Sequence, residues 1–268
     1  MLFPQAVDVT VLQKFHGAVI FDLDFRIRSM AEMKMQGDAK APGETLNPLS
    51  LQRGCAAVIA SMAWFGLGVQ LYFNIAEALA KNLPMTAHLI TFFSYFTIEI
   101  NCLVAVVVTI FWAQPQAKRF LTGPSFNAAL VVYIIVVGVV YELLLRHLWH
   151  PHGMQLLADV LLHDAVPLFY SLFWLLLLPK GVLRWPDPVT WLIYPLLFFF
   201  YSMLRGAALG TYTYPFIDAS QLGLARVSVN ATVLLAVFFG LGAAVTALDH
   251  ALGSNSRERS GLGRAAEL

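Results

Sequence analysis

The chain has 268 residues, of which 59% are hydrophobic and only 12% are charged, and its mean hydropathy is +0.69. Soluble domains carry about 25% charged residues, so too few polar side chains remain here to cover a soluble globule, and the composition indicates an integral membrane protein. The 17 Lys and Arg against 16 Asp and Glu leave a net charge of +1, which gives no basic surface for nucleic acid.

Charged side chains interrupt every apolar run in residues 1–52, which are therefore predicted to form an N-terminal extension. A membrane-spanning helix needs about 20 apolar residues. Six segments of a transmembrane domain over residues 53–250 meet that length: 55–80, 89–113, 125–146, 155–178, 188–209 and 227–249. The predicted fold is all-α, a polytopic six-transmembrane-helix bundle. The Ser-, Gly- and Arg-rich residues 251–268 are predicted to form a disordered tail.

The distribution of Lys and Arg predicts the orientation of the bundle. Six spans place both termini on one side of the membrane. If that side is the cytoplasm, 13 of the 17 Lys and Arg lie inside and 4 lie outside, as is typical of cell-membrane proteins whose cytoplasmic loops hold the positive charge. We therefore expect a multi-pass protein of the cell membrane, with the extension and the tail both cytoplasmic.

Ionisable side chains within spans are costly and mark functional sites by default. In the predicted topology they gather in the outer half of the bundle. Asp159 and His163 are four residues apart on one helix face, and such a carboxylate orients the imidazole and stabilises its charged form. Thr97 is expected at the depth of His163, so its hydroxyl would complete a set of nucleophile, base and orienting carboxylate. Asp164 is a second candidate for the carboxylate.

Five further residues are candidates for substrate binding. Arg146 or Arg205 would bind a carboxylate or a head group, although Arg146 is also placed to extend to the membrane interface. Asn101 shares a helix face with the candidate threonine. Tyr214 suits the interfacial aromatic belt, and Asp218 either caps a turn or faces the site from above.

Two other polar groups have competing interpretations. His147, His150 and His152 follow the third predicted span in RHLWHPHG, a spacing that can bind a transition metal. The pattern is no recognised zinc signature and Pro151 sets a turn there, so we expect neither metal nor other cofactor. A stripe in the first span, Gln70, Asn74 and Glu77, is expected to form hydrogen bonds between helices.

Four motifs resemble the bacterial Pr-six-Pr membrane proteins: LLLRHLWHPHG, LLHDAVPLFY, WLIYP and TYPFID. Those proteins in turn resemble the eukaryotic androgen-induced-protein family, six-span hydrolases that cleave fatty acid esters of hydroxy fatty acids with a threonine and a histidine. The resemblance covers about residues 55–250 and implies a bacterial inner-membrane protein. FTIEIN places Thr97 at the family threonine, and LLHDAVP places His163 at the family histidine. Asp164 departs from the eukaryotic pattern, where a hydroxyl residue is expected.

These observations predict a lipid-ester hydrolase with an intramembrane Thr/His site near the outer leaflet, whose partners are a lipid substrate and the surrounding membrane lipids. Two other classes remain open. One is a non-enzymatic binder or transporter of lipids or small molecules, in which the same polar groups bind without turnover. The other is a metal-dependent membrane hydrolase that uses the histidine cluster.

Overall fold

The computed structural model describes residues 47–116, 120–148 and 150–265, with side chains up to Ser254. Residues 1–46 are not described, so most of the expected N-terminal extension lies outside the described residues. The described part is helical and contains no strand. Six of its helical segments are long and apolar enough to cross a membrane: Pro48–Ala80, Phe96–Ala113, Pro124–Leu148, Met154–Leu177, Asp187–Leu209 and Ala219–Ser254. The protein is an all-α, six-span integral membrane protein.

The first span, α2 (Pro48–Ala80), begins before residue 53 because Asn47 caps it. The Asn47 side chain accepts a hydrogen bond from the N–H of Leu49, and Pro48 occupies the first helical position, where it needs no hydrogen-bond partner. The last residues assigned to the extension by sequence thus belong to the first span.

The second span is divided, which the sequence does not predict. Three residues separate the helix α3 (Met85–Phe92) from α4 (Phe96–Ala113). Ser94 lies in the break, where its hydroxyl bonds the carbonyl of Ile90 and pairs with the hydroxyl of Tyr201. A serine that bonds a carbonyl one turn back offers the chain an alternative to the helical ladder. The break places Thr97 in the first turn of α4.

The third and fourth spans each contain one π-helical turn. The third consists of α5 (Pro124–Val140), the π-helical η2 (Tyr141–Leu145) and η3 (Arg146–Leu148). The fourth consists of α6 (Met154–Val160), the π-helical η4 (Leu161–Ala165) and α7 (Val166–Leu177). Such turns are rare and are frequent at functional sites. Here they contain His163 and Tyr141, which contact each other.

The fifth span consists of the short helix α8 (Asp187–Trp191) and of α9 (Ile193–Leu209), and the sixth lies within α10 (Ala219–Ala265). The 3₁₀ turn η5 (Pro215–Ile217) precedes α10, which contains a kink at Gly223 with φ of 73°. The sequence predicts a disordered tail from residue 251, whereas α10 is assigned through Ala265. No proline interrupts residues 251–265, so the backbone ladder can continue.

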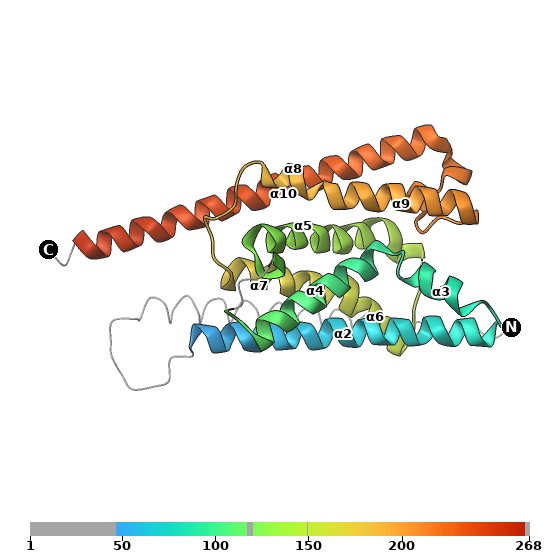
Figure 1. Ribbon diagram of the computed structural model, residues 1–268, viewed down its shortest axis with the longest axis horizontal. Helices are drawn as coiled ribbons and strands as arrows, with labels where there is room; N and C mark the ends of the chain where they lie inside the picture. Colours follow the sequence, from blue (N-terminus) through green and yellow to red (C-terminus); the bar gives the residue numbers. More distant parts are fainter. Residues whose placement is uncertain (1–46, 117–119, 149, 266–268) are drawn as a thin grey trace. The chain divides into compact units, whose positions relative to one another are not determined.

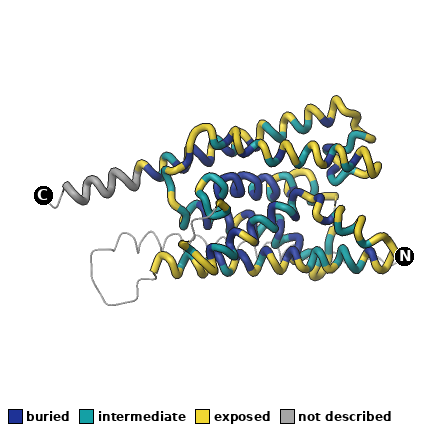
Figure 2. The backbone as a smooth tube through the Cα atoms, viewed as in Figure 1, coloured by how far each residue is buried: buried dark blue, intermediate teal, exposed yellow. Residues whose placement is uncertain are grey.

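The buried residues concentrate on α4, α5 and α7 (Figure 1, Figure 2), and α2 packs against α4 and α7. The helices α9 and α10 lie together beside α5 and keep most of their side chains exposed (Figure 2). Those exposed side chains are largely apolar, as expected of a surface that faces lipid rather than water.

Candidate functional site

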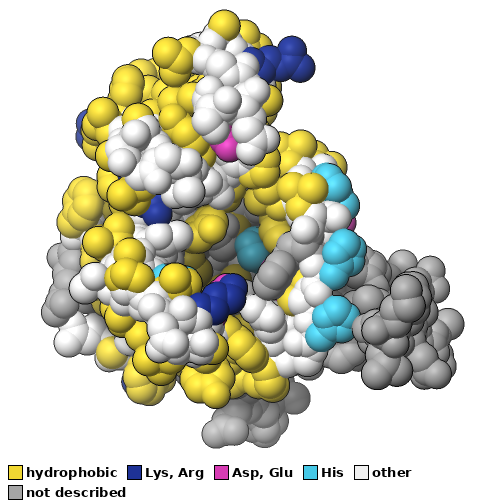
Figure 3. Space-filling view, turned by 90° about the vertical axis from the view of Figure 1, so that its right-hand side faces the viewer, with side chains coloured by type: hydrophobic (Ala, Val, Ile, Leu, Met, Phe, Trp, Pro, Cys, Tyr) yellow, Lys and Arg dark blue, Asp and Glu magenta, His cyan; other side chains and the backbone are white. Residues whose placement is uncertain are grey.

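A cavity of about 500 Å³ opens at the end of the bundle where α2 ends and α4 begins. Its lining comes from α2, α4, the two π-helical turns, α6 and the loop before η5. Figure 3 shows this face hollowed, with a histidine side chain visible inside the hollow. His163 is the histidine that lines the cavity, together with Thr97, Asp159 and Tyr214 among the residues predicted for the site.

Asp159, His163 and Tyr141 form the most buried polar cluster of this cavity. The Asp159 side chain is 3% exposed and the His163 side chain 12%. His163 Nδ1 lies 3.2 Å from Asp159 Oδ1, and the Tyr141 hydroxyl donates to Asp159 Oδ2 over 2.5 Å. The Tyr141 and His163 rings stack at a centroid distance of 3.7 Å. One buried carboxylate therefore holds both the imidazole and the phenol.

The contacts of His163 determine which ring nitrogen carries the proton in the neutral imidazole. Besides the Asp159 carboxylate, Nδ1 lies 3.0 Å from the Asp159 backbone carbonyl oxygen. Both partners are acceptors, so Nδ1 must be the protonated nitrogen. The lone pair is then on Nε2, for which the described residues provide no hydrogen-bond partner. This is the tautomer that a general base requires.

Close packing fixes the backbone of η4 beneath His163. A side chain at Gly138 of α5 would place its Cβ 3.0 Å from the carbonyl oxygen of His163, a contact so tight that the backbone of η4 would have to shift. On another side, Asn101 donates to the carbonyls of Leu162 and Thr97 over 3.1 and 2.9 Å. Asn101 was predicted to bind substrate, but it is fully buried and is not among the lining residues. It joins α4 to the π-helical turn instead.

Arg146 and Asp164 form a second cluster, outside the cavity lining. Arg146 donates to Asp164 over 2.5 Å, also pairs with Glu142, and lies over the Tyr141 ring at 5.0 Å. Two carboxylates already match its charge, so a substrate carboxylate would have to displace one of them. Asp164 is correspondingly turned to Arg146 and not to His163, and Asp159 is the carboxylate that contacts the imidazole.

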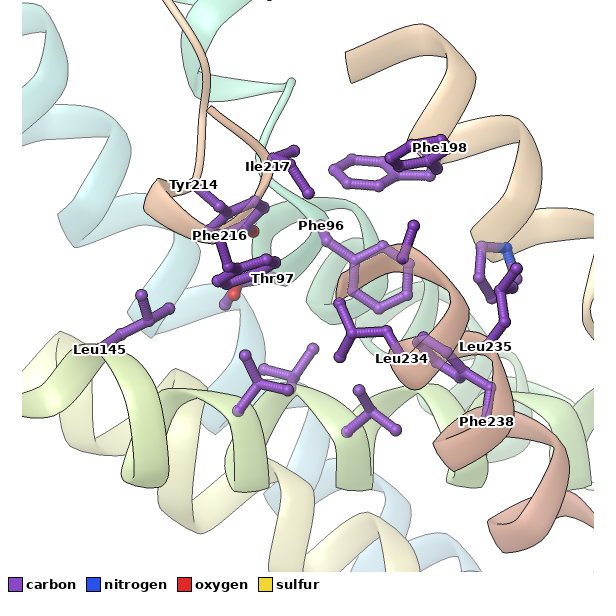
Figure 4. A pocket seen from close by; sticks show the side chains of 16 residues that line it. Phe96, Thr97, Leu145, Phe198, Tyr214, Phe216, Ile217, Leu234, Leu235 and Phe238 are labelled. Atoms are coloured by element: carbon purple, nitrogen blue, oxygen red, sulfur yellow. The ribbon is translucent and has the colours of Figure 1, made fainter. Parts of the chain in front are cut away.

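Thr97 lies between the polar cavity and a narrow apolar slot of about 90 Å³. The slot is lined by aromatic and aliphatic side chains of α4, α5, α9 and α10. Figure 4 shows Thr97 and Tyr214 at one side of the slot and Phe198 and Phe238 at the other. Tyr214 also lines both spaces, so these two residues form the boundary.

The Tyr214 hydroxyl faces the first turn of α4, where the side chain of Thr97 and the backbone N–H groups of Phe96 and Thr97 contact it. Burial raises the pKa of Tyr214 above its ordinary value, although those contacts oppose the shift. The phenol therefore stays protonated at neutral pH. The sequence placed Tyr214 at the membrane interface, and the structure buries it against the candidate nucleophile.

Arg205 and Asp218 do not line the cavity. Arg205 donates to the hydroxyl of Thr91 over 2.6 Å and to the carbonyl of Thr211. The Ser220 hydroxyl donates to Asp218, as do the N–H groups of Ser220 and Gln221, and these hydrogen bonds lower the pKa of Asp218. The bonds from the two N–H groups cap the start of α10. Of the two roles considered for Asp218, capping is the one observed.

Sequence reasoning missed two features of the cavity. Tyr141 was not a candidate because a tyrosine in an apolar span resembles ordinary core. The stripe Gln70, Asn74 and Glu77 was expected to bond other helices, but all three residues line the cavity, and none of them bonds another helix within the described residues. Their helical spacing identified a shared face, and only the packing of α2 shows that this face borders open space.

The histidines after the third span do not form a metal centre with other described residues. His147, His150 and His152 are exposed, and no three His, Cys, Asp or Glu side chains of the described chain are close enough together to hold an ion. The metal-dependent alternative therefore has no ligand set in the described geometry.

No family model, curated protein or solved structure with which the chain was compared matches it.

Proposed function

We propose that this protein is a hydrolase of lipid esters that acts within the outer half of the membrane. The observation that carries the proposal is the Asp159–His163 pair, in which a buried carboxylate holds Nδ1 while the described residues provide no partner for Nε2. Thr97 lines the same cavity as this pair. The resemblance of FTIEIN and LLHDAVP to the threonine and histidine motifs of a hydrolase family supports the same two residues.

The position of Thr97 favours an amphipathic substrate. An ester carbonyl at Thr97 would place the polar alcohol part in the 500 Å³ cavity and the first part of the acyl chain in the aromatic slot. Apolar lining with a few convergent polar groups is the usual composition of small-molecule sites. Holding the ester at this boundary would orient it for attack without a charged anchor.

The proposed reaction is acyl transfer in two steps. The Thr97 oxygen attacks the ester carbonyl while His163 Nε2 takes the hydroxyl proton, and Asp159 stabilises the resulting imidazolium. His163 then gives that proton to the leaving alcohol as the C–O bond breaks. In the second step His163 Nε2 takes a proton from a water molecule, whose oxygen attacks the acyl-threonine carbonyl. The imidazolium then returns that proton to the Thr97 oxygen as the acyl–oxygen bond breaks, which releases the fatty acid and restores the free threonine. The Tyr141 hydroxyl keeps the Asp159 carboxylate in place throughout.

The test compares variants of the purified full-length protein with a long-chain ester. Thr97→Ala and His163→Ala should each reduce turnover at least 100-fold, and the double variant should be no worse because the residues act as one unit. Thr109→Ala and His250→Ala are matched controls on α4 and α10, outside the cavity lining, and should retain activity. Activity that survives Thr97→Ala but not His163→Ala would make water the nucleophile, and equal loss in the controls would refute the assignment.

The break in the second span favours one further candidate, a non-enzymatic binder. Half-helix N-termini inside the membrane often point at the polar groups of transported ligands, and α4 begins beside the cavity. Lipid binding with no turnover of any ester, and with His163→Ala binding like the wild type, would establish this second function.

A further inference from the structure

The charges around the cavity restrict the chemistry of the alcohol part of the substrate. Two carboxylates line the cavity, Asp159 and Glu77, and no Lys or Arg does so in the part of the chain that the structure describes. Lys81, at the end of α2, pairs with Glu77 over 2.5 Å. The lining would therefore repel an anionic ligand, and it contains no unpaired Lys or Arg that could bind one.

The neighbouring arginines lie outside the lining of the cavity. Arg146 is paired with two carboxylates, Glu142 and Asp164. Arg205 donates to Thr91 and Thr211, whereas no carboxylate among the described residues pairs with it and its Nε is buried without a partner. A ligand carboxylate or phosphate in the cavity would lose its hydration without gaining an ion pair, which is costly away from bulk water.

The remaining polar lining is neutral and suited to hydrogen bonding. Gln70 and Asn74 lie one turn apart on α2, with Gln155 and Thr213 on other parts of the wall. Asn74 Oδ1 and Thr213 Oγ1 are buried and have no hydrogen-bond partner in the described structure. Buried polar atoms are normally satisfied, so a ligand or water in the cavity must supply what the protein does not.

The α2 stripe has the dimensions of a small head group. Gln70 and Glu77 are seven residues apart, which at 1.5 Å per residue corresponds to about 10 Å along the helix. The stripe consists of amides followed by a carboxylate that is already paired with Lys81. Its hydrogen-bonding capacity matches hydroxyl or amide groups, which both donate and accept.

We propose that the Gln70–Asn74 face of α2 is a subsite for a neutral, hydroxyl- or amide-bearing head group, and that the cavity discriminates against anionic ones. The subsite rests on the proposed function for one point only, the position of the acyl chain in the aromatic slot on the other side of Thr97. It replaces the expectation that Arg146 or Arg205 binds a substrate carboxylate.

The experiment measures binding separately from catalysis. Two non-hydrolysable ligands with the same hexadecyl ether tail, one ending in glycerol and one in a carboxylate, are titrated into the full-length protein in nanodiscs. The glycerol ether should bind about tenfold more tightly or better, the equivalent of one to two good hydrogen bonds. Asn74→Leu should remove most of that preference, whereas the control Ser61→Ala, exposed on the same helix, should retain it. Gln70→Leu provides a second variant if Asn74→Leu does not fold.

Equal or tighter binding of the carboxylate ether, or a preference that survives both substitutions, would overturn the subsite. Turnover of the corresponding glycerol and hydroxy-acid esters is measured in parallel. Hydrolysis with preference for the anionic ester would leave the hydrolase proposal intact and refute the subsite. Preferential binding of the glycerol ether without hydrolysis of either ester would refute the hydrolase and retain the subsite.

Discussion

Replacing Tyr141 by Phe tests the hydrogen bond that fixes the carboxylate of the site. The substitution removes the hydroxyl that donates to Asp159 Oδ2 and retains the ring that stacks on His163. Tyr133 provides a matched control in the same span. Its hydroxyl donates over the same distance, 2.5 Å, to the backbone carbonyl of Trp191. Tyr133 is 7% exposed and Tyr141 4%, so the two substitutions differ chiefly in the charge of the acceptor.

The expected magnitudes follow from that difference. Side-chain hydrogen bonds in membrane proteins contribute about 0.6 kcal/mol on average and up to about 1.7 kcal/mol. Bonds to an ionised acceptor are roughly twice as strong as neutral ones. We therefore expect Tyr133→Phe to lower the free energy of unfolding by about 0.6 kcal/mol and Tyr141→Phe by about 1.2 to 1.5 kcal/mol.

Unfolding of each variant in mixed micelles by increasing SDS, followed by tryptophan fluorescence, gives the two differences from the wild type. The ratio is more informative than either value, because both variants share the micelle and the unfolded state. Equal losses, or a larger loss for Tyr133→Phe, would mean that the hydrogen bond to Asp159 is no stronger than a hydrogen bond to a neutral carbonyl. The role of Asp159 as partner of an imidazolium would then be wrong.

Three further predictions concern packing, titration and topology. Gly138→Ala should lower stability and turnover, because the added Cβ would press on the His163 carbonyl of η4. The control Gly68→Ala should be neutral or stabilising, because no atom lies within 4 Å of the added Cβ there. Unfolding by SDS compares the stability of the two variants. Burial lowers the pKa of Lys180 to about 8, so from pH 8 toward its ordinary value of about 10.5 the unfolded chain binds more protons there. The stability of the wild type relative to Lys180→Met should therefore rise with pH across that window, and a flat difference would contradict the shift. In a cysteine-free background, an impermeant maleimide applied to intact cells should label His152→Cys but not Ser256→Cys, and the opposite pattern would reverse the predicted orientation.

Local composition was sufficient to predict the all-α, six-span fold. A membrane-spanning helix can be recognised in the sequence as a run of about 20 apolar residues. In hydrocarbon the backbone N–H and C=O groups must form their hydrogen bonds within that helix. The same rule cannot predict where a span is interrupted. The break at Ser94 and the π-helical turns at Tyr141 and Leu161 contain no proline or glycine to mark them.

The pairing of polar side chains was predictable only where it is local. Asp159 and His163 are four residues apart, and helical geometry alone brings them into contact. The partner of Arg146 in the fourth span, the stacking of Tyr141 on His163, and the burial of Tyr214 against α4 all join residues distant in sequence. Their positions depend on how the spans rotate and pack against one another. Sequence periodicity thus determined which face of each helix is polar, whereas tertiary packing decided which of those faces became a cavity wall and which became an internal ion pair.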